Sequence, residues 1–134
     1  RKNIAHLIQC FAQLVREEGI QDLLLVLVGT QGWDYKNILQ EISNYDSIKN
    51  RIIITGRVAD EDLAAIYSDA LVFIYPSLYE GFGLPPLEAM QCSVPVITSN
   101  TSSLPEVVGN AGIMVNPKNT DELCHSILEI FGAI

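Results

Sequence analysis

Apolar and polar residues alternate along this chain in short blocks, which predict helices and strands in turn. Residues 4–15 carry apolar side chains three and four positions apart, a spacing typical of a helix that buries one face, and we expect Asn3 to cap its start. Residues 23–29 and 71–75 are short, nearly continuous apolar runs. Such runs are typical of strands buried on both faces of a parallel sheet.

The same alternation continues to the end of the chain. We expect helices at 35–47, 60–69, 86–92 and from 104 onward, strands at 51–56, 95–99 and 112–115, and a last helix that starts near Asn119, with Glu122 in capping-box spacing. Strands and helices in alternation with short connections predict an α/β fold. The expected architecture is a Rossmann-like, doubly wound parallel sheet of about five strands with helices on both faces. No linker or repeat divides residues 1–134, so we predict a single domain.

Composition excludes several classes of function. The net charge of −8 disfavours general nucleic-acid binding, which depends on clustered Lys and Arg. No apolar run approaches the roughly 20 residues of a membrane span. The three cysteines lack metal-site or redox spacing, and their odd number, with no leader-like segment at the start, favours a reducing, cytoplasmic setting.

The strongest candidate for a ligand site is the segment that follows the apolar run 71–75. Glu80 and Glu88 bracket a turn that contains Gly81 and Gly83 and leads into a helix started by prolines. In open α/β sheets, ligands bind outside the carboxyl ends of the strands. Glycines let backbone N–H groups approach an anion or a sugar closely, and a helix N-terminus favours negative charge. We therefore expect a small-molecule site at this end of the sheet.

The spacing of Glu80 and Glu88, with this filling, resembles the signature of family-four retaining glycosyltransferases of the GT-B fold. The similarity continues through Tyr75-Pro76-Ser77, Val94-Pro95-Val96-Ile97 and Leu104-Pro105-Glu106-Val107-Val108-Gly109, so that it covers nearly the whole chain. The resemblance implies that residues 1–134 form the donor-binding, nucleotide-sugar half of such an enzyme. It also implies that the first strand of this half and the N-terminal acceptor-binding domain are missing, so that this fragment is inactive alone.

The resemblance assigns roles to individual residues. Glu88 accepts hydrogen bonds from the ribose hydroxyls, and Glu80 contacts the transferred sugar beside the reacting centre as the catalytic residue. The backbone of Gly81, Phe82, Gly83 and Leu84 holds the sugar and diphosphate. Lys2 neutralises the leaving diphosphate; Val58, after Gly56-Arg57, contacts the base.

The same resemblance implies the reaction and the partners. It predicts transfer of a hexose, mannose or glucose-like, from a nucleotide-diphosphate sugar to a glycan or glycoconjugate, with a weak preference for GDP-mannose. Front-face attack and double displacement both remain open for Glu80. No metal or other cofactor is expected, since Asp60-Glu61-Asp62 opens a helix, where acids complement the dipole, and we expect His6 and His125 to be solvated. The resemblance implies a cytoplasmic protein whose contact with a membrane is peripheral and made through the missing domain.

Two alternatives remain open. A non-enzymatic, flavodoxin-like binding or regulatory domain fits the alternation of strands and helices, although the first strand end lacks the acidic cluster of a response regulator. A sugar-nucleotide epimerase of the GT-B fold shares the same cleft. Product analysis of the full-length protein distinguishes an epimerase from a transferase.

Overall fold

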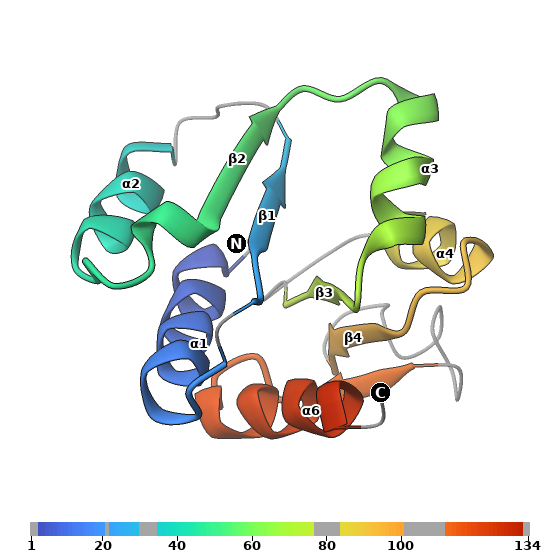
Figure 1. Ribbon diagram of the computed structural model, residues 1–134. Helices are drawn as coiled ribbons and strands as arrows, with labels where there is room; N and C mark the ends of the chain where they lie inside the picture. Colours follow the sequence, from blue (N-terminus) through green and yellow to red (C-terminus); the bar gives the residue numbers. More distant parts are fainter. Residues whose placement is uncertain (1–2, 21, 30–34, 77–83, 101–111, 133–134) are drawn as a thin grey trace.

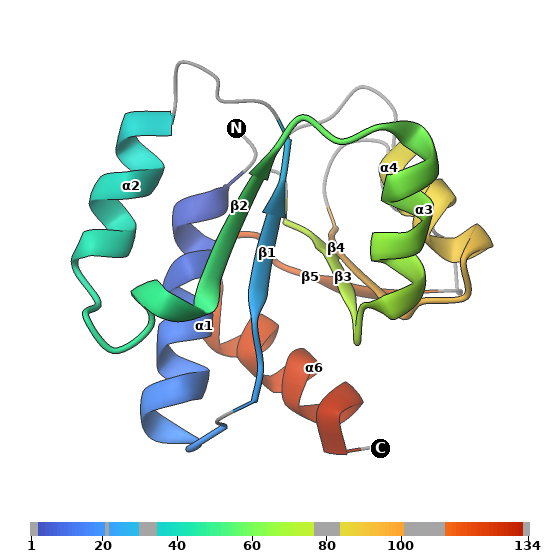
Figure 2. The ribbon, with the colours of Figure 1, turned by 45° about the horizontal axis from the view of Figure 1, so that its top comes forward.

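The chain folds into parallel β-structure between two layers of helices (Figures 1 and 2). A computed structural model describes residues 3–20, 22–29, 35–76, 84–100 and 112–132. The strands are β1 (Leu25–Val28), β2 (Ile52–Gly56), β3 (Phe73–Tyr75), β4 (Val96–Ser99) and β5 (Ile113–Val115). The helices are α1 (Ile4–Glu17), α2 (Tyr35–Ser43), α3 (Asp60–Asp69), α4 (Leu84–Gln91) and α6 (Thr120–Gly132), with a 3-10 turn η1 (Lys49–Arg51) before β2.

The predicted α/β, Rossmann-like fold class is confirmed, and most elements lie where the sequence pattern predicts them. Helix α3 has the expected bounds, whereas α2 ends at Ser43, four residues earlier than expected. The helix expected from residue 104 lies outside the described residues.

The described strands form two parallel sheets instead of one. Strands β1 and β2 pair with each other, and β3, β4 and β5 form the second sheet with β4 in its centre. Between β1 and β3 the described chain has no pairing, although a flavodoxin-like order would place them in direct contact. The fold therefore gives no support to the flavodoxin-like alternative.

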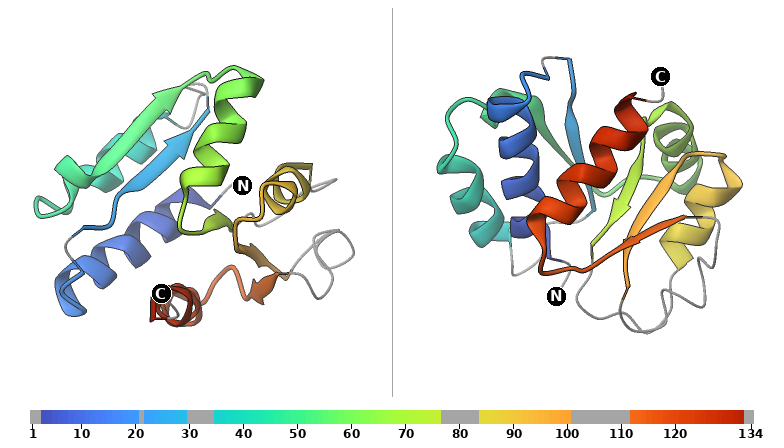
Figure 3. Two further views of the ribbon diagram at one scale, coloured as in Figure 1. Left: turned by 45° about the vertical axis from the view of Figure 1, so that its right-hand side comes forward. Right: turned by 90° about the horizontal axis from the view of Figure 1, so that it is seen from below.

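Three apolar clusters hold these layers together. Helices α1 and α6 share one cluster with strands from both sheets, centred on Leu14, Ile97 and Leu123. Ile8 and Phe11 join α1 to α2 in a second cluster, and Tyr67, Ala89 and Val96 join α3 and α4 in a third. Helices α1, α2 and α6 thus cover one face, and α3 and α4 cover part of the other, as the two views of Figure 3 show.

Three expectations about α1 and α6 need correction. Asn3 does not cap α1: it has φ 63°, and its side chain donates to the Pro117 carbonyl at 2.7 Å. His6 is buried instead of solvated, because α6 packs over it and brings Thr120 Oγ1 within 3.1 Å of its Nδ1. Asn119 caps α6 through a bond from the Glu122 N–H, but the Glu122 carboxylate accepts from Asn116, so the capping box is not reciprocal.

Candidate functional site

The candidate site lies at the carboxyl ends of the strands, where the connections to α3 and α4 begin. Gly29 directly follows β1 and Gly56 ends β2, and the Gly29 N–H donates to the Gly56 carbonyl at 3.1 Å. Gly56 has φ +72°, a conformation that a side chain would strain. This turn sends the chain through Arg57 and Val58 into α3, so that the predicted base-binding segment lies beside the sheet edge.

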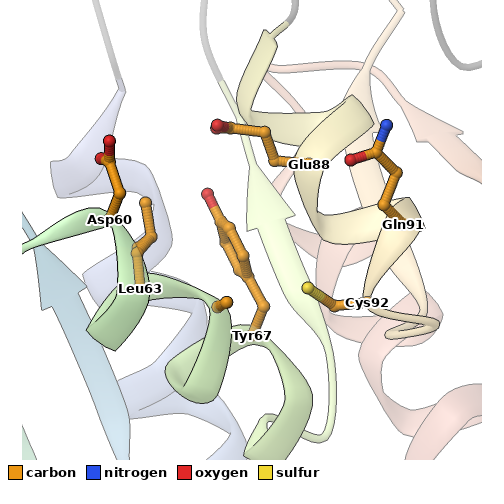
Figure 4. Close-up of a pocket in the computed structure, with 7 residues that line it drawn as sticks. Asp60, Leu63, Tyr67, Glu88, Gln91 and Cys92 are labelled. Atoms are coloured by element: carbon orange, nitrogen blue, oxygen red, sulfur yellow. The ribbon is translucent and has the colours of Figure 1, made fainter.

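A cavity of about 160 Å³ opens between α3 and α4. Its lining comes from both helices and from the residue just after α4: Asp60, Leu63, Ala64, Tyr67, Glu88, Gln91 and Cys92. Figure 4 shows the carboxylates of Asp60 and Glu88 on opposite sides of its mouth, with the Tyr67 hydroxyl directed between them. Ligand sites usually measure roughly 300–1,000 Å³. This cavity therefore suits one portion of a ligand, not a whole nucleotide sugar.

Glu88, the predicted ribose-binding residue, is exposed at this cavity. It lies in the second turn of α4. The next residue, Ala89, packs in the apolar cluster with Val96 of β4, whereas the Glu88 carboxylate lies on the exposed side of the helix, where a ligand can reach it. Among the residues that the structure describes, two carboxylates and no Lys or Arg line the cavity. The charge of this pocket therefore favours hydroxyl and N–H donors, such as a ribose or a base, over a phosphate.

Tyr67 supports one wall of the cavity. Its ring is 7% exposed and packs edge-on against Phe73, with the ring centroids 5.2 Å apart. Burial first, then the charges of Glu88 and Cys92, raise the pKa of Tyr67 to about 12. At neutral pH the hydroxyl therefore keeps its proton and remains a hydrogen-bond donor beside the two carboxylates.

The described residues test only part of the predicted site. Glu88 and the segment around Val58 lie at the same edge of the structure, and Leu84 begins α4. Lys2, Glu80, Gly81, Phe82 and Gly83 lie outside the described residues, so their roles remain predictions. The sequence pattern did not identify Asp60 and Tyr67 as site residues. By sequence alone, Asp60 is an acidic residue in the first turn of a helix, and Tyr67 is an ordinary core residue. Only the packing of α3 on α4 brings both to Glu88.

The family of glycosyl transferases group 1 matches residues 1–131. The O-antigen chain mannosyltransferase B of Escherichia coli is 45% identical over 96% of this chain and 33% of its own length. The serotype-specific mannosyltransferase WbdA of Escherichia coli is 38% identical over 92% of this chain and 15% of its own. The chain thus spans about a third or less of the length of these relatives.

Solved structures agree with this match. Sucrose-phosphate synthase of Thermosynechococcus elongatus superposes with a TM-score of 0.86 at 32% identity, over 98% of this chain and 33% of the synthase. HepE of Anabaena, solved in complex with UDP, gives a TM-score of 0.84 at 25% identity, over 98% of this chain and 36% of HepE. Sequence motif, fold and relatives lead to one conclusion: the chain belongs to the glycosyl transferases group 1 family.

Proposed function

We propose that residues 1–134 form the donor-binding domain of a retaining glycosyltransferase, which moves a hexose from a nucleotide-diphosphate sugar to a glycan or glycoconjugate. The observation that carries the proposal is the position of Glu88, exposed at the mouth of a cavity beside the carboxyl edge of the sheet, within a chain of this family. A carboxylate in this position can accept hydrogen bonds from both ribose hydroxyls.

The other parts of the donor have their own proposed partners. Val58 contacts the base, whereas the backbone of residues 81–84 and the Lys2 ammonium bind the diphosphate. Glu80 lies beside the transferred sugar and stabilises the positive charge that develops there. Since the described residues that line the cavity at Glu88 include two carboxylates and no basic side chain, this division of the donor fits the local charge.

The proposed donor sugar is mannose, carried by GDP, with a glucose-like hexose as the second choice. Two similar proteins are named mannosyltransferases, which supports this preference, whereas the similar structure of HepE was solved in complex with UDP. We propose that the reaction needs no metal, because each charged part of the donor already has a proposed protein partner.

The rest of the protein completes the enzyme in this proposal. An acceptor-binding domain outside residues 1–134 closes over the donor, and association with a cytoplasmic membrane face is peripheral and occurs through that domain. None of the described helices has both the length and the apolar character that a bilayer crossing requires.

Calorimetric titration with GDP, UDP, ADP and their hexose conjugates tests the donor site directly. The measurement uses the full-length protein, with and without EDTA, and compares the wild type with Glu88→Ala. We expect one nucleotide to bind best without metal, and Glu88→Ala to weaken its binding by about 1.5–3 kcal/mol, because a charged hydrogen-bond acceptor is lost.

Glu61→Ala is the matched control, since Glu61 is an exposed acid of the first turn of α3 that does not line the cavity. Its binding should equal that of the wild type. Equal affinity of wild type and Glu88→Ala would refute the ribose role of Glu88, and loss of binding with EDTA would refute the metal-independent site.

A further inference from the structure

Two buried cysteines meet where α1 packs on α6, the helices that lie side by side in Figure 3. Cys10 of α1 and Cys124 of α6 are 114 positions apart in the chain, yet their Sγ atoms lie 2.9 Å from each other. A disulfide bond is about 2.05 Å long, so each sulfur would need to move by only about 0.4 Å to close one. The packing of the two helices therefore places both thiols within reach of bond formation.

The surroundings of the pair hold this arrangement in place. Cys10 and Cys124 belong to one apolar cluster with Leu7 of α1 and Leu123 of α6. Cys10 is fully buried and Cys124 is 5% exposed, and the Cys124 thiol also lies 3.6 Å from the Cys10 carbonyl. Because both sulfurs are enclosed in this way, a small oxidant suits the pair better than a bulky disulfide reagent.

The pair also contains a group that can begin an oxidation. The hydrogen bond from Cys10 lowers the pKa of the Cys124 thiol, although burial and the nearby carboxylates of Asp121, Glu17 and Glu18 act against this shift. The same hydrogen bond, with burial, raises the pKa of Cys10. Cys124 is therefore the sulfur that ionises first, and the thiolate is the nucleophile in thiol oxidation.

The two sulfurs form a unit of their own. In the part of the chain that the structure describes, no group of three or more His, Cys, Asp or Glu side chains is arranged to hold a metal ion. The third cysteine, Cys92, is half-buried and packs against the separate cluster of α3 and α4. Reaction of Cys10 and Cys124 with each other is therefore the chemistry that the geometry favours.

We propose that Cys10 and Cys124 are a modification site at which a small hydroperoxide, such as hydrogen peroxide, forms a reversible disulfide that links α1 to α6. First, the Cys124 thiolate attacks a peroxide oxygen: an S–O bond forms, the O–O bond breaks, and hydroxide leaves and takes up the proton that Cys124 released. Next, the Cys10 sulfur attacks the Cys124 sulfur: the S–S bond forms, the S–O bond breaks, and hydroxide leaves with the Cys10 proton as water. The two thiols lose two electrons, which reduce one peroxide to two waters. The inference does not depend on the donor-binding proposal.

Disulfide mapping of the full-length protein tests this proposal. The protein is treated with hydrogen peroxide, the remaining thiols are alkylated in urea, and the non-reduced tryptic peptides are analysed by mass spectrometry. Trypsin cuts after Lys and Arg and so places Cys10, Cys92 and Cys124 in three different peptides. We expect the peptides of Cys10 and Cys124 to appear as one linked species, two hydrogen masses lighter than their sum, and dithiothreitol to separate them.

Cys92→Ser is the matched control, because it removes the cysteine that lies outside this pair. It should leave the link between Cys10 and Cys124 unchanged, whereas Cys124→Ser should abolish it. A link from Cys92 to either of the other two, or no link between Cys10 and Cys124 in the wild type, overturns the proposal. The wild-type result stands by itself, so a variant that fails to fold does not affect it.

Hydrogen exchange in the full-length protein measures the effect of the bond on the two helices. A disulfide restricts the openings that separate the segments it joins. After peroxide treatment, the amides of α1 and α6 should exchange more slowly by on the order of 10-fold or more, while those of α3 and α4 change little. Dithiothreitol should reverse the change. Equal exchange in α1 and α6 before and after oxidation would contradict the link between these helices.

Discussion

Single residues in this protein gain their chemistry from neighbours that are distant along the chain. Tyr67 and Glu88 meet at one cavity through the packing of α3 on α4. His6 meets Thr120 across 114 positions, and Cys124 Sγ lies 2.9 Å from Cys10 Sγ. The hydrogen bond to Cys124, together with burial, raises the pKa of the Cys10 thiol and keeps it protonated.

The burial of His6 predicts a pH dependence of stability. Burial lowers the pKa of His6, and its Nε2 has no hydrogen-bond partner among the described residues. A histidine whose folded-state pKa lies below the unfolded value of 6.5 favours folding above that pH, and the contribution is lost as the pH falls. We expect the free energy of unfolding to decrease from about pH 7 to about pH 5, and to decrease less in His6→Gln.

Urea unfolding at several pH values measures this effect. His125→Gln is the control, because His125 is largely exposed and lies beside Glu129 at 3.0 Å on the surface of α6. If His6→Gln and the wild type lose the same free energy between the two pH values, His6 does not titrate as its burial predicts.

At the scale of elements, hydrogen bonds from polar side chains stabilise the ends of helices and strands. The Arg51 guanidinium donates to the Leu23 carbonyl at 2.8 and 3.1 Å and to the Ile20 carbonyl at 3.0 Å, and it lies 5.9 Å from the centre of the Phe11 ring. These contacts tie the connection between α1 and β1 to the start of β2. Sequence patterns do not predict these contacts, because every residue has a backbone carbonyl and the residue type does not show which carbonyl will accept a bond.

Replacing Arg51 should therefore destabilise the sheet of β1 and β2. We expect Arg51→Met to lower the free energy of unfolding by about 1.5–3 kcal/mol, because charged hydrogen bonds to two carbonyls are lost. Arg51→Lys should recover only part, since an ammonium lacks the planar fork of a guanidinium. Arg16→Lys, at the exposed end of α1, is the control. If Arg51→Met lowers the free energy of unfolding no more than Arg16→Lys does, Arg51 does not have the proposed role.

The cap of α6 gives a smaller prediction. Asn119 Oδ1 accepts from the Glu122 N–H at 3.0 Å, and we expect Asn119→Ala to cost about 1 kcal/mol in the free energy of unfolding. Urea unfolding compares it with Asn44→Ala, at an exposed position just after α2. Equal midpoints of urea unfolding for Asn119→Ala and Asn44→Ala would show that the cap does not contribute to the stability of the fold.

At the scale of the whole molecule, we propose that residues 1–134 are one domain of a longer protein. It spans about a third of the length of the O-antigen chain mannosyltransferase B to which it is similar. Donor contacts and acceptor contacts would come from different domains, so that neither domain alone can bring the two substrates together.

Residues 1–134 alone are therefore expected to transfer no sugar, while the full-length protein transfers hexose from its preferred donor. A radiolabelled-donor assay with both forms measures this, and Glu80→Gln in the full-length protein is the inactive reference. Transfer by residues 1–134 at the full-length rate would refute the division into two domains.

Much of the fold is readable from the sequence because its signals are local. The apolar periodicity of residues 4–15 and the acids and apolar residues of 60–69 specify helices without reference to the rest of the chain, and both helices are found there. The same holds for Glu88, which a contiguous motif identifies and which the structure places at a cavity.

Other features depend on long-range packing, which no local pattern encodes. The division of the described strands into two sheets and the approach of Asp60 to Glu88 arise from how the helices and strands pack on one another. The burial of His6 has the same origin, because the spacing of α1 marks it as polar and only α6 covers it. Local periodicity specifies which segments become helix or strand, whereas the free energy of burial between distant segments selects their partners.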